Sequence, residues 1–488
     1  MEQVVTIKEM KEIEQKTYAV QHISSFDLMV KVGKEIYKTF QKEDSKSKTF
    51  LLLCGTGNNG GDALVFGEEA FKQNKKVHAV IIGQPSKQTE ESLLMIKRYQ
   101  DQNMELSFVE HYRDFITLVD QINHIDIIID GLFGIGLSKK VAGLYKDVID
   151  WMNQQKIKTL SIDCPSGLNA DTGEIMGTAV KADLTYTIEA YKQGLLINDG
   201  LDCTKDIKVI HVGMESIPNQ KFLYDTFQPM PTRIHNSHKY HYKNVLTIGG
   251  QVGVMGALTL AGQSALVSGV GLSTIATNIQ HQDHFVRSIP ELMYEVIQDQ
   301  KDLLKLINKK DAILFGLGIK ASTPFEQMIF DTLIQTDIPL VLDAAGILFL
   351  KQKKHSKNQR IIITPHYGEF AKLMDVDVNT ISQNPTYYIN QCINIYHCEV
   401  VLKGPSTIYA NQNQMLYLNQ GTPALAKAGS GDVLAGIILT FASRNLPIEH
   451  AILLHMFAGQ EAKSKKHVES ILAQDIINSI HLVYKKYG

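Results

Sequence analysis

The chain has few cysteines, and their spacing excludes two common kinds of site. Of its 488 residues five are cysteine, an odd number, and no two of them form a CxxC pair. Scattered thiols of this kind do not predict a disulfide framework or a zinc site. We therefore expect a protein of the reducing cytoplasm. The thiols are Cys54, Cys164, Cys203, Cys392 and Cys398.

An excess of charge is also missing. The chain carries 49 Lys and Arg against 51 Asp and Glu, a formal net charge of −2. Because no surplus of cations exists to neutralise phosphates, we expect neither a nucleic-acid partner nor an acidic membrane surface. The expected partners are small-molecule substrates and further copies of the same chain in a homo-oligomer.

Hydrophobic runs are short or interrupted. The first residues, MEQVVTIKEMKEIEQKTYAV, mix charged and apolar side chains and contain no hydrophobic signal core. No Asp, Glu, Lys or Arg lies between Lys243 and Asp283, a length that could span a bilayer. Glycines and amides interrupt this segment, so it predicts a buried strand, turn and helix rather than a membrane span.

What the chain does contain is an alternation of apolar strands with helical stretches. Its length implies at least two domains, and this alternation is typical of parallel sheets with helices on both faces. We predict an α/β fold of two doubly wound domains, residues 1–212 and 233–488, joined by a linker at 213–232. One or two amphipathic helices are expected within about residues 5–40. The predicted strands are Phe50–Leu53, Val77–Ile82, Ile125–Ile129, Thr159–Ile162, Leu184–Thr187 and Ile207–His211, then Val245–Ile248, Leu272–Ala276, Ala312–Phe315, Pro339–Leu342, Ile361–Ile363 and Val400–Leu402.

The turn GTGNNGGD after the first strand has a dinucleotide-binding spacing but lacks the partner of that motif. Gly55-x-Gly57-x-x-Gly60 is the glycine pattern of a Rossmann turn. Such folds place an acidic residue about 20 positions later, where it binds the ribose, and this chain has Gly83 and Gln84 there. The pattern therefore does not predict a dehydrogenase.

The same turn is nevertheless suited to a ligand. The first N–H groups of the helix that follows attract anions. The side-chain oxygens of Asn58 and Asn59 suit a hard cation, whereas Asp62 taken alone could be a helix cap. Two asparagines in one tight turn favour the ligand interpretation.

Two later strands end in similar motifs. Asp130 follows a strand in IIIDGLFGIGL, and Asp163 and Ser166 follow another in LSIDCPSGLNADTGE. Each acid alone is a common turn former. In doubly wound sheets, however, ligands bind at the carboxyl ends of the strands, so we predict that these residues and Asn59 share one crevice.

GNNGGD, DGLFGIG and DCPSGL have the order and spacing of the epimerase domain of the bifunctional NAD(P)H-hydrate repair family, which about residues 5–212 resemble. The resemblance assigns a potassium ion to Asn59, Asp130 and Ser166. It assigns the substrate to Asp163 and to two further segments. The early helix departs from the family, because LMVKVGK stands where Met-Glu-x-Ala-Gly is usual. The two segments are Asn58, Asn59, Gly60, Gly61 and Asp62, and Gly134, Ile135, Gly136, Leu137, Ser138, Lys139 and Lys140.

The second half lacks the GxxxxGK[ST] phosphate loop of P-loop nucleotidases. Its strongest motif is Gly429-Ser430-Gly431-Asp432, which opens a predicted helix over Val433–Ala442. Backbone N–H groups at such a helix start form an anion hole, and the adjacent Asp432 carboxylate can accept a proton from an attacking hydroxyl. A helix cap after a flexible turn is the alternative interpretation of Asp432.

Two other strand ends supply polar groups for the same chemistry. VVLKGPSTIY places Lys403, Ser406 and Thr407 after a strand, where they suit a nucleotide phosphate or ribose. IITPHYGEF places His366 and Glu369 after another, although a lone His is often a hydrogen-bonded structural residue. The three histidines of RIHNSHKYH have a spacing that fits no common zinc pattern.

The motifs GGQVGVMGA, GLG, TPHYGE, KGPST and AGSGD are similar to those of the ribokinase-like superfamily, and closest to its nucleotide-dependent NAD(P)H-hydrate dehydratases, over about residues 230–488. The resemblance implies a ribokinase-like C-terminal domain beside a Rossmann-like N-terminal one, and Mg²⁺ with ADP or ATP. It assigns the hydrate to Ala257, Gly318, His366 and Asp432, and the nucleotide to Lys403, Gly404, Pro405, Ser406, Thr407 and Gly431.

Several positions depart from the dehydratase pattern. Leu317 replaces a proline, Ser430 replaces a threonine, and Ala345 replaces the second acid of Asp-Ala-Asp. Met-Pro becomes Val254-Met255, and His-Lys-Gly-Asp becomes HKYH. We expect the loss at Ala345 to weaken the handling of magnesium or substrate, whereas Ser430 keeps the hydroxyl.

Together the two halves predict a bifunctional metabolite-repair enzyme. Water adds across the 5,6 double bond of a reduced nicotinamide and leaves a C6 hydroxyl in either configuration. The resemblance implies that the C-terminal half phosphorylates and expels that hydroxyl from the S epimer, with ADP favoured over ATP as donor. The N-terminal half would interconvert the R and S epimers, with Asp163 as its acid–base group. The alternatives are a ribokinase-like small-molecule kinase fused to a nucleotide-binding domain, and a nucleotide-sensing protein without catalysis.

Overall fold

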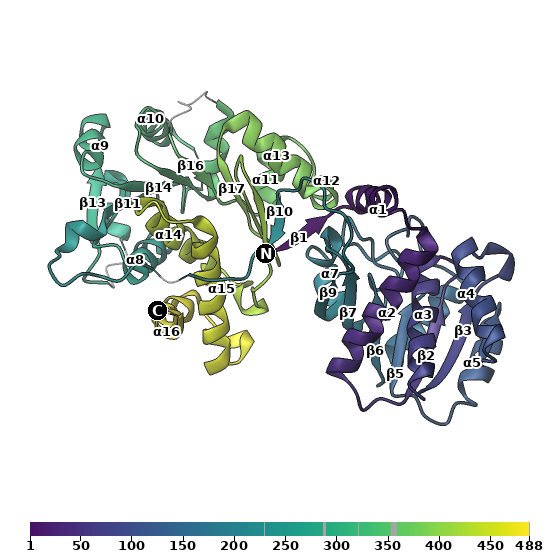
Figure 1. The fold of residues 1–488 in the computed structure, drawn as a ribbon. Helices are drawn as coiled ribbons and strands as arrows, with labels where there is room; N and C mark the ends of the chain where they lie inside the picture. The colour runs from purple at the N-terminus through teal and green to yellow at the C-terminus, as the bar shows by residue number, and fades with distance from the viewer. Residues whose placement is uncertain (229, 286–288, 321, 353–358, 488) are drawn as a thin grey trace. The chain divides into compact units, whose positions relative to one another are not determined.

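The computed structural model describes residues 1–228, 230–285, 289–320, 322–352 and 359–487. The chain divides into two compact units, one formed by Glu2–Lys221 and the other by the residues from Phe222 onward together with Met1. Each unit contains a largely parallel sheet with helices packed on it (Figure 1). Lys221–Leu223, inside the segment predicted as a linker, forms the short strand β10.

The sheet of the N-terminal unit is parallel, with the strand order β4-β3-β2-β5-β6-β7-β9. Its central strands are continuous apolar runs, such as the fully buried Leu51, Leu52 and Leu53, because helices cover both faces of a parallel sheet. Each strand predicted from the sequence of this half is confirmed. The strands are β2 (Thr49–Cys54), β3 (Lys76–Ile82), β4 (Leu106–Val109), β5 (Ile127–Gly131), β6 (Lys158–Ile162), β7 (Ala182–Ile188) and β9 (Thr204–Ile210), with β1 (Glu2–Val5) paired to β8 (Tyr191–Lys192).

Helices α2, α3 and α4 pack on one face of this sheet, where Phe40, Phe50 and Phe66 make edge-on ring contacts with centroids 5.6–5.7 Å apart. Helices α5 and α6 pack on the other face around Phe115 and Trp151. The predicted early amphipathic helices are confirmed as α1 and α2, which begin with capping boxes. The helices are α1 (Ile7–Gln21), α2 (Ser25–Glu43), α3 (Asn58–Lys72), η1 (Pro85–Lys87), α4 (Glu90–Asp101), α5 (Tyr112–Val119), α6 (Leu144–Gln154), η2 (Gln193–Leu195) and α7 (Gly200–Cys203).

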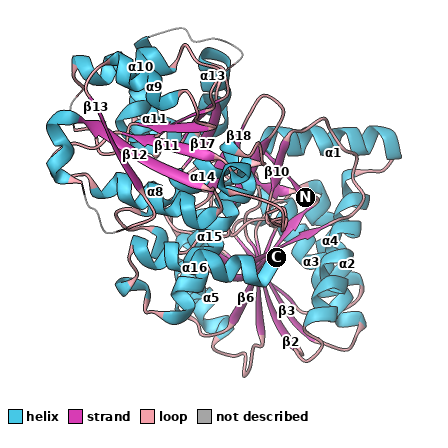
Figure 2. Ribbon diagram, turned by 90° about the vertical axis from the view of Figure 1, so that its left-hand side faces the viewer, coloured by secondary structure: helices cyan, strands magenta, loops and turns pink. Residues whose placement is uncertain are grey.

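The C-terminal unit contains parallel strands in the order β13-β12-β11-β14-β15-β16-β17, followed by the antiparallel strands β18 and β19 and then β10. Figure 2 shows three helices on one side of these strands, α9 (Gln300–Ile307), α10 (Pro324–Leu333) and α13 (Pro385–Tyr396). On the other side it shows α8 (Gly256–Ser268) and α14 (Ser430–Ser443). The strands predicted in this half are likewise confirmed. The strands are β11 (Asn244–Ile248), β12 (Leu272–Asn278), β13 (Met293–Ile297), β14 (Ala312–Phe315), β15 (Leu340–Leu342), β16 (Ile361–Ile363), β17 (Glu399–Leu402), β18 (Thr407–Ala410) and β19 (Met415–Leu418).

The apolar segment between Lys243 and Asp283 forms β11, a turn, α8 and β12, as predicted. Within the described residues, no helix is long and apolar enough to cross a membrane. α8 is instead buried against α14 in the core of its unit. The helices are η3 (Lys239–Tyr242), α8 (Gly256–Ser268), η4 (Ile279–His284), α9 (Gln300–Ile307), α10 (Pro324–Leu333), η5 (Ala344–Gln352), α11 (Tyr367–Met374), α12 (Val378–Gln383), α13 (Pro385–Tyr396), η6 (Pro423–Leu425), α14 (Ser430–Ser443), α15 (Ile448–Lys465), η7 (Val468–Ser470) and α16 (Ala473–Tyr487).

Candidate functional site

The glycine-rich turn between β2 and α3 is tightly packed. A Cβ atom at Gly60 would lie 2.2 Å from the carbonyl oxygen of Gly55, so the position requires glycine. α3 begins at Asn58 with Gly57 as its N-cap, and no side chain of the described residues caps it. The interpretation of Asp62 as the helix cap is therefore wrong, because Asp62 lies more than a turn into the helix.

Asp130 is fully buried near the end of β5. The carboxylate accepts from the Ser161 hydroxyl at 2.7 Å, from the Ser166 amide at 2.8 Å and from the Ser166 hydroxyl. The Leu132 amide donates to it at 3.3 Å. Burial raises the pKa of Asp130, against the opposing effect of the hydrogen bonds from Ser166 and Ser161. Among its described hydrogen-bond partners none is charged.

Asn59 lies beside the loop that follows β5. Its side-chain oxygen would be 3.3 Å from a Cβ atom at Gly134. Asn59 is buried, and its Nδ2 atom has no hydrogen-bond partner within the described part of the chain. In the same loop, the Phe133 amide donates to the Ser166 hydroxyl at 2.8 Å. The loop therefore connects Asn59 to the Asp130–Ser166 pair.

The chemistry of these three side chains fits an alkali cation. They offer an amide oxygen, a carboxylate and a hydroxyl, which are hard oxygen ligands. A monovalent cation would also balance the buried charge of Asp130. The described residues hold no group of three or more His, Cys, Asp or Glu side chains that could bind a metal ion.

Asp163 follows β6 and pairs with a buried lysine. Its φ of +66° lies in the left-handed region, which is uncommon for a residue other than glycine. The side chain of Lys192 is 0% exposed, and its Nζ atom lies 2.6 Å from Oδ1 of Asp163. Lys192 also donates to the Ile188 carbonyl at 2.6 Å, and the Ile188 amide donates to Asp163 Oδ1 at 3.3 Å. β8, which carries Lys192, thus holds the Asp163 carboxylate in place.

The Asp163–Lys192 pair lines a pocket between the first helices and the start of α3. Burial raises the pKa of Asp62 well above its usual range, and the carboxylates of Asp163 and Glu14 raise it further. Burial and Asp163 also raise the pKa of Glu14. The pocket therefore combines two acids whose pKa values are raised with an ion-paired carboxylate. Its polar lining includes Glu14, Tyr18, Asn58, Asp62, Asp163 and Lys192.

The pocket includes only part of the predicted substrate site. Asn58, Asp62 and Asp163 line it, whereas the described lining includes no residue of the loop 134–140. In that loop Lys139 and Lys140 are exposed. The sequence reasoning missed Glu14, Tyr18 and Lys192. α1 carries the first two at ordinary helical spacing, and only a lysine inside the apolar stretch AYKQGLLI could have indicated the third.

The start of α14 is the second site. α14 begins at Ser430, with Gly429 as its N-cap at φ +89°, and within the described chain no side chain caps it. The interpretation of Asp432 as a helix cap is therefore wrong. The Ser430 hydroxyl lies 3.1 Å from Nε2 of His455, a buried histidine of α15. Burial lowers the pKa of His455 to about 4, so its ring is neutral near pH 7.

Lys403, at the end of β17, lies close to this helix start. Its Nζ atom is 2.8 Å from Oδ1 of the buried Asp343 and would be 3.4 Å from a Cβ atom at Gly431. Burial lowers the pKa of Lys403, but the carboxylates of Asp343 and Glu369 outweigh this and raise it above the usual value. Burial and Asp343 raise the pKa of Asp432 to about 6, against the opposing effect of Lys403. Asp432 is therefore a carboxylate that can accept a proton near neutral pH.

His366 is hydrogen-bonded within the chain. It is the N-cap of α11, and its Nδ1 atom accepts from the amides of Gly368 at 3.0 Å and Glu369 at 3.3 Å. The Nδ1 atom of His366 therefore has the structural, hydrogen-bonded role that a lone histidine often has. The side chain is 60% exposed, so the Nε2 edge of the ring can still reach a ligand.

Gly318, a predicted hydrate-binding residue, lies in a second tight turn. Gly318 has φ +64°, and a Cβ atom there would lie 2.7 Å from the Val254 carbonyl oxygen. The Gln251 amide donates to the Gly318 carbonyl at 2.9 Å, so the β11–α8 turn is hydrogen-bonded to the loop after β14. Ala257, in the first turn of α8, belongs to the same arrangement, and Leu317 is a buried core residue.

The predicted nucleotide segment runs from β17 into β18. Ser406 and Thr407 are buried, and the Ser406 hydroxyl has no hydrogen-bond partner in the described residues. Gly404 lies against the Tyr367 ring, which a Cβ atom would approach to 3.0 Å. Asp343, the first acid of the segment in which Ala345 replaces the second, is the ion-pair partner of Lys403.

Comparison with known proteins finds a matching family model for each half of the chain. A family model described as "YjeF-related protein N-terminus" matches residues 25–194, and one described as "NAD(P)H-hydrate dehydratase" matches residues 245–482. A bifunctional NAD(P)H-hydrate repair enzyme, Nnr, of Coxiella burnetii is 30% identical over 475 residues, which covers 94% of this chain and 95% of the relative. The chain belongs to the bifunctional NAD(P)H-hydrate repair enzyme family.

Other members of the family and a single-domain structure are also similar. The repair enzyme of Thermosynechococcus vestitus is 32% identical and covers 84% of this chain and 83% of its own length. An ADP/ATP-dependent NAD(P)H-hydrate dehydratase from Bacillus subtilis, co-crystallised with ATP/Mg²⁺, is 28% identical. It covers 53% of this chain and 95% of its own, with a TM-score of 0.48.

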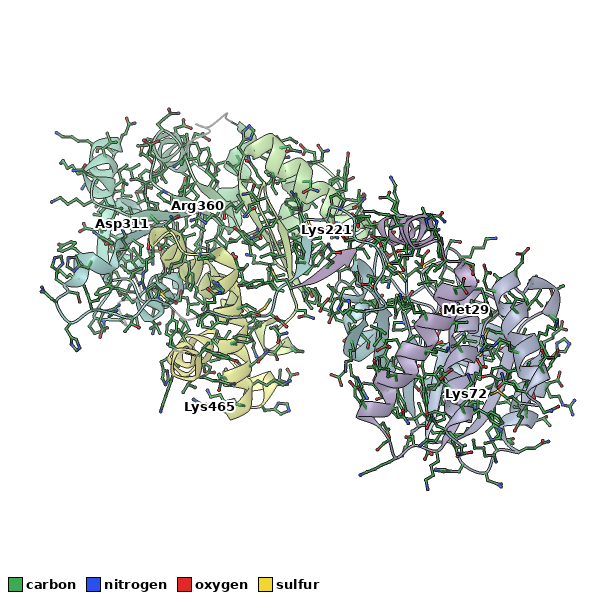
Figure 3. The ribbon with its side chains drawn as sticks, in the orientation of Figure 1. Met29, Lys72, Lys221, Asp311, Arg360 and Lys465 are labelled. Carbon is green, nitrogen blue, oxygen red and sulfur yellow. The ribbon has the colours of Figure 1, made fainter. Side chains whose placement is uncertain are left out.

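The family match and the pocket do not cover the same residues. Glu14 and Tyr18 precede residue 25, where the match to the first family model begins, yet both line the pocket with Asp163. The departure from the family in LMVKVGK lies on α2. There Gly33 packs against Val65 of α3, and Met29 lies against Gly61 (Figure 3 labels Met29). The turn that carries Asn58 is thus supported by α2 without the usual glutamate.

Proposed function

We propose that this family member repairs hydrated NADH and NADPH at two separate sites. The N-terminal half, residues 1–212, interconverts the R and S hydrates. The C-terminal half, residues 233–488, dehydrates the S epimer at the expense of ADP, with ATP as the other donor. Membership of the bifunctional family supports this proposal. The pairing of a proton-accepting Asp432 with Lys403 at the start of α14 is the observation that carries it.

In the N-terminal half, Asp163 is the acid–base group. Epimerisation at C6 proceeds by ring opening or through an iminium-like species, and either route moves a proton to or from the C6 hydroxyl. Asn58 and Asp62, which line the pocket with Asp163, bind the substrate. The loop 134–140, which does not line the pocket, supplies the other predicted substrate contacts. Asn59, Asp130 and Ser166 would hold potassium, which supplies a fixed positive charge near the turn.

In the C-terminal half, Asp432 accepts the proton of the C6 hydroxyl as its oxygen attacks the terminal phosphorus of the nucleotide. The bond from that phosphorus to the rest of the nucleotide breaks, and the nucleotide leaves with one phosphate fewer. The ring nitrogen then expels phosphate by cleavage of the C6–O bond, and loss of a proton from C5 restores the double bond. Phosphorylation is needed because hydroxide is a poor leaving group.

The surrounding residues bind the two substrates. Lys403 and the N–H groups around Gly431 stabilise charge on the transferred phosphoryl group. Gly404, Pro405, Ser406 and Thr407 bind the rest of the nucleotide, and Mg²⁺ would accompany its phosphates. Ala257, Gly318 and His366 contact the hydrate.

A single assay tests the proposal. The purified full chain receives a mixture of NADH-hydrate epimers with ADP or ATP, and NADH absorbance and free phosphate are followed. Full conversion with equal release of phosphate is expected. Conversion of one epimer only would contradict the epimerase assignment, and a stable phosphorylated product would indicate a kinase instead.

A further inference from the structure

The ammonium of Lys192 is buried in the wall of the N-terminal pocket. A lysine with no exposed surface is rare, because the charge must leave water. An ion pair that served stability alone could be replaced by well-packed apolar side chains at little cost. This pair lies in the wall of the pocket instead, and one of its members is the proposed acid–base group.

The two carboxylate oxygens of Asp163 have different partners. Oδ1 forms the ion pair with Lys192 Nζ at 2.6 Å and accepts a hydrogen bond from the Ile188 amide at 3.3 Å. Lys192 is itself fixed by its bond to the Ile188 carbonyl. No hydrogen bond to Oδ2 is present within the described residues, so Oδ2 is the oxygen that remains for a substrate.

The charged side chains that line the pocket also point to a role for Lys192. Of the described residues that line it, Glu14, Asp62 and Asp163 are acidic and Lys192 is the one basic residue. The ammonium contacts Asp163, and Asp62 and Glu14 hold their protons more tightly than free carboxyls. Without Lys192, the Asp163 carboxylate would face two further acids with no compensating charge.

We propose that Lys192 is a positioning residue for epimerisation: its ammonium balances the charge of the Asp163 carboxylate and turns Oδ2 toward the C6 hydroxyl of the substrate. This inference rests on the proposed epimerase function. It adds a residue that lies on β8, outside the three motifs by which the sequence indicates this site.

The first test replaces Lys192 by a neutral side chain of similar length. K192M in the full chain should lower repair of the purified R epimer about 100-fold or more, the usual contribution of a positioned acid–base group. Dehydration of the S epimer, measured on the same preparation, should stay within about twofold of wild type, since it uses the other unit. The conservative K192R should recover part of the lost kcat.

The second test separates charge from packing. K192A leaves space for three methylenes and an ammonium, so propylammonium should restore its R-epimer repair in a saturable manner. The neutral 1-propanol should not. If K192A does not fold, as judged by thermal unfolding, the comparison of K192M with K192R decides between charge and packing.

A matched control is Lys221 on β10 (labelled in Figure 3), which pairs with Glu9 at 2.5 Å and is largely buried. K221M should leave R-epimer repair unchanged, because Lys221 does not line the pocket. R-epimer repair by K192M within threefold of wild type would overturn the proposal, as would equal rescue by propanol. If the wild-type chain does not repair the R epimer, the proposed epimerase function is wrong. This outcome differs from a failure of the Lys192 proposal, in which the wild-type chain and K192M both repair the R epimer.

Discussion

Asp163 is the proposed acid–base group of the epimerase half. We expect Asp163→Asn to lower repair of the R epimer by a factor of about 10²–10⁴, because the amide cannot accept a proton. Dehydration of the S epimer should be unchanged. The measurement is NADH formation from each purified epimer in the presence of ADP, and equal losses for both epimers would contradict the role given to Asp163.

The pKa of Asp432 predicts the pH dependence of the dehydratase half. Burial and Asp343 raise this pKa to about 6, and only the ionised form can accept a proton. The rate with the S epimer should therefore be constant above about pH 7 and fall about tenfold per unit well below pH 6. Initial rates between pH 4.5 and 8 check this.

The control for the pH profile is Asp432→Asn, which should be slow at every pH and show no inflection near 6. An unchanged inflection in this variant would assign the titration to another group.

At the level of elements, the start of α3 depends on one close approach of backbones. We expect Gly60→Ala to destabilise the fold by about 1–3 kcal/mol, because the new Cβ atom would meet the Gly55 carbonyl oxygen at 2.2 Å. It should also impair epimerisation by displacing Asn58 and Asn59. Thermal unfolding and R-epimer repair are the measurements.

The same turn offers the matched control. A Cβ atom at Gly57 would meet nothing within 4 Å, and the φ of −97° is open to any residue. Gly57→Ala should therefore leave both stability and R-epimer repair close to wild type. Equal losses in the two variants would show that backbone freedom, rather than close packing, determines the need for glycine.

The strands show which elements the sequence pattern predicts and which it misses. Runs such as LLL in β2 and III in β16 were predicted correctly, since central parallel strands are apolar on both faces. β4 (LSFV) and β13 (MYEVI) were missed, because these strands at the sheet edges mix buried and exposed residues. β18 and β19 form a short antiparallel hairpin that the strand–helix alternation does not indicate.

At the scale of the whole molecule, the two activities belong to different units of one chain. We expect Asp163→Asn and Asp432→Asn to complement each other when mixed, because a released hydrate can diffuse from one protein to the other. The mixture should repair both epimers completely, although each variant alone should not repair the R epimer. Repair of the S epimer alone by the mixture would contradict this independence.

The sequence by itself determined the two-domain α/β class, the three motifs of the first site and the AGSGD helix start. Each of these is local: a strand, a glycine turn and a polar side chain within a few residues. Only the tertiary structure brought Glu14 of α1 and Lys192 of β8 to Asp163, and Asp343 to Lys403. These partners come from distant segments, and burial sets their charges, so no local spacing specifies them.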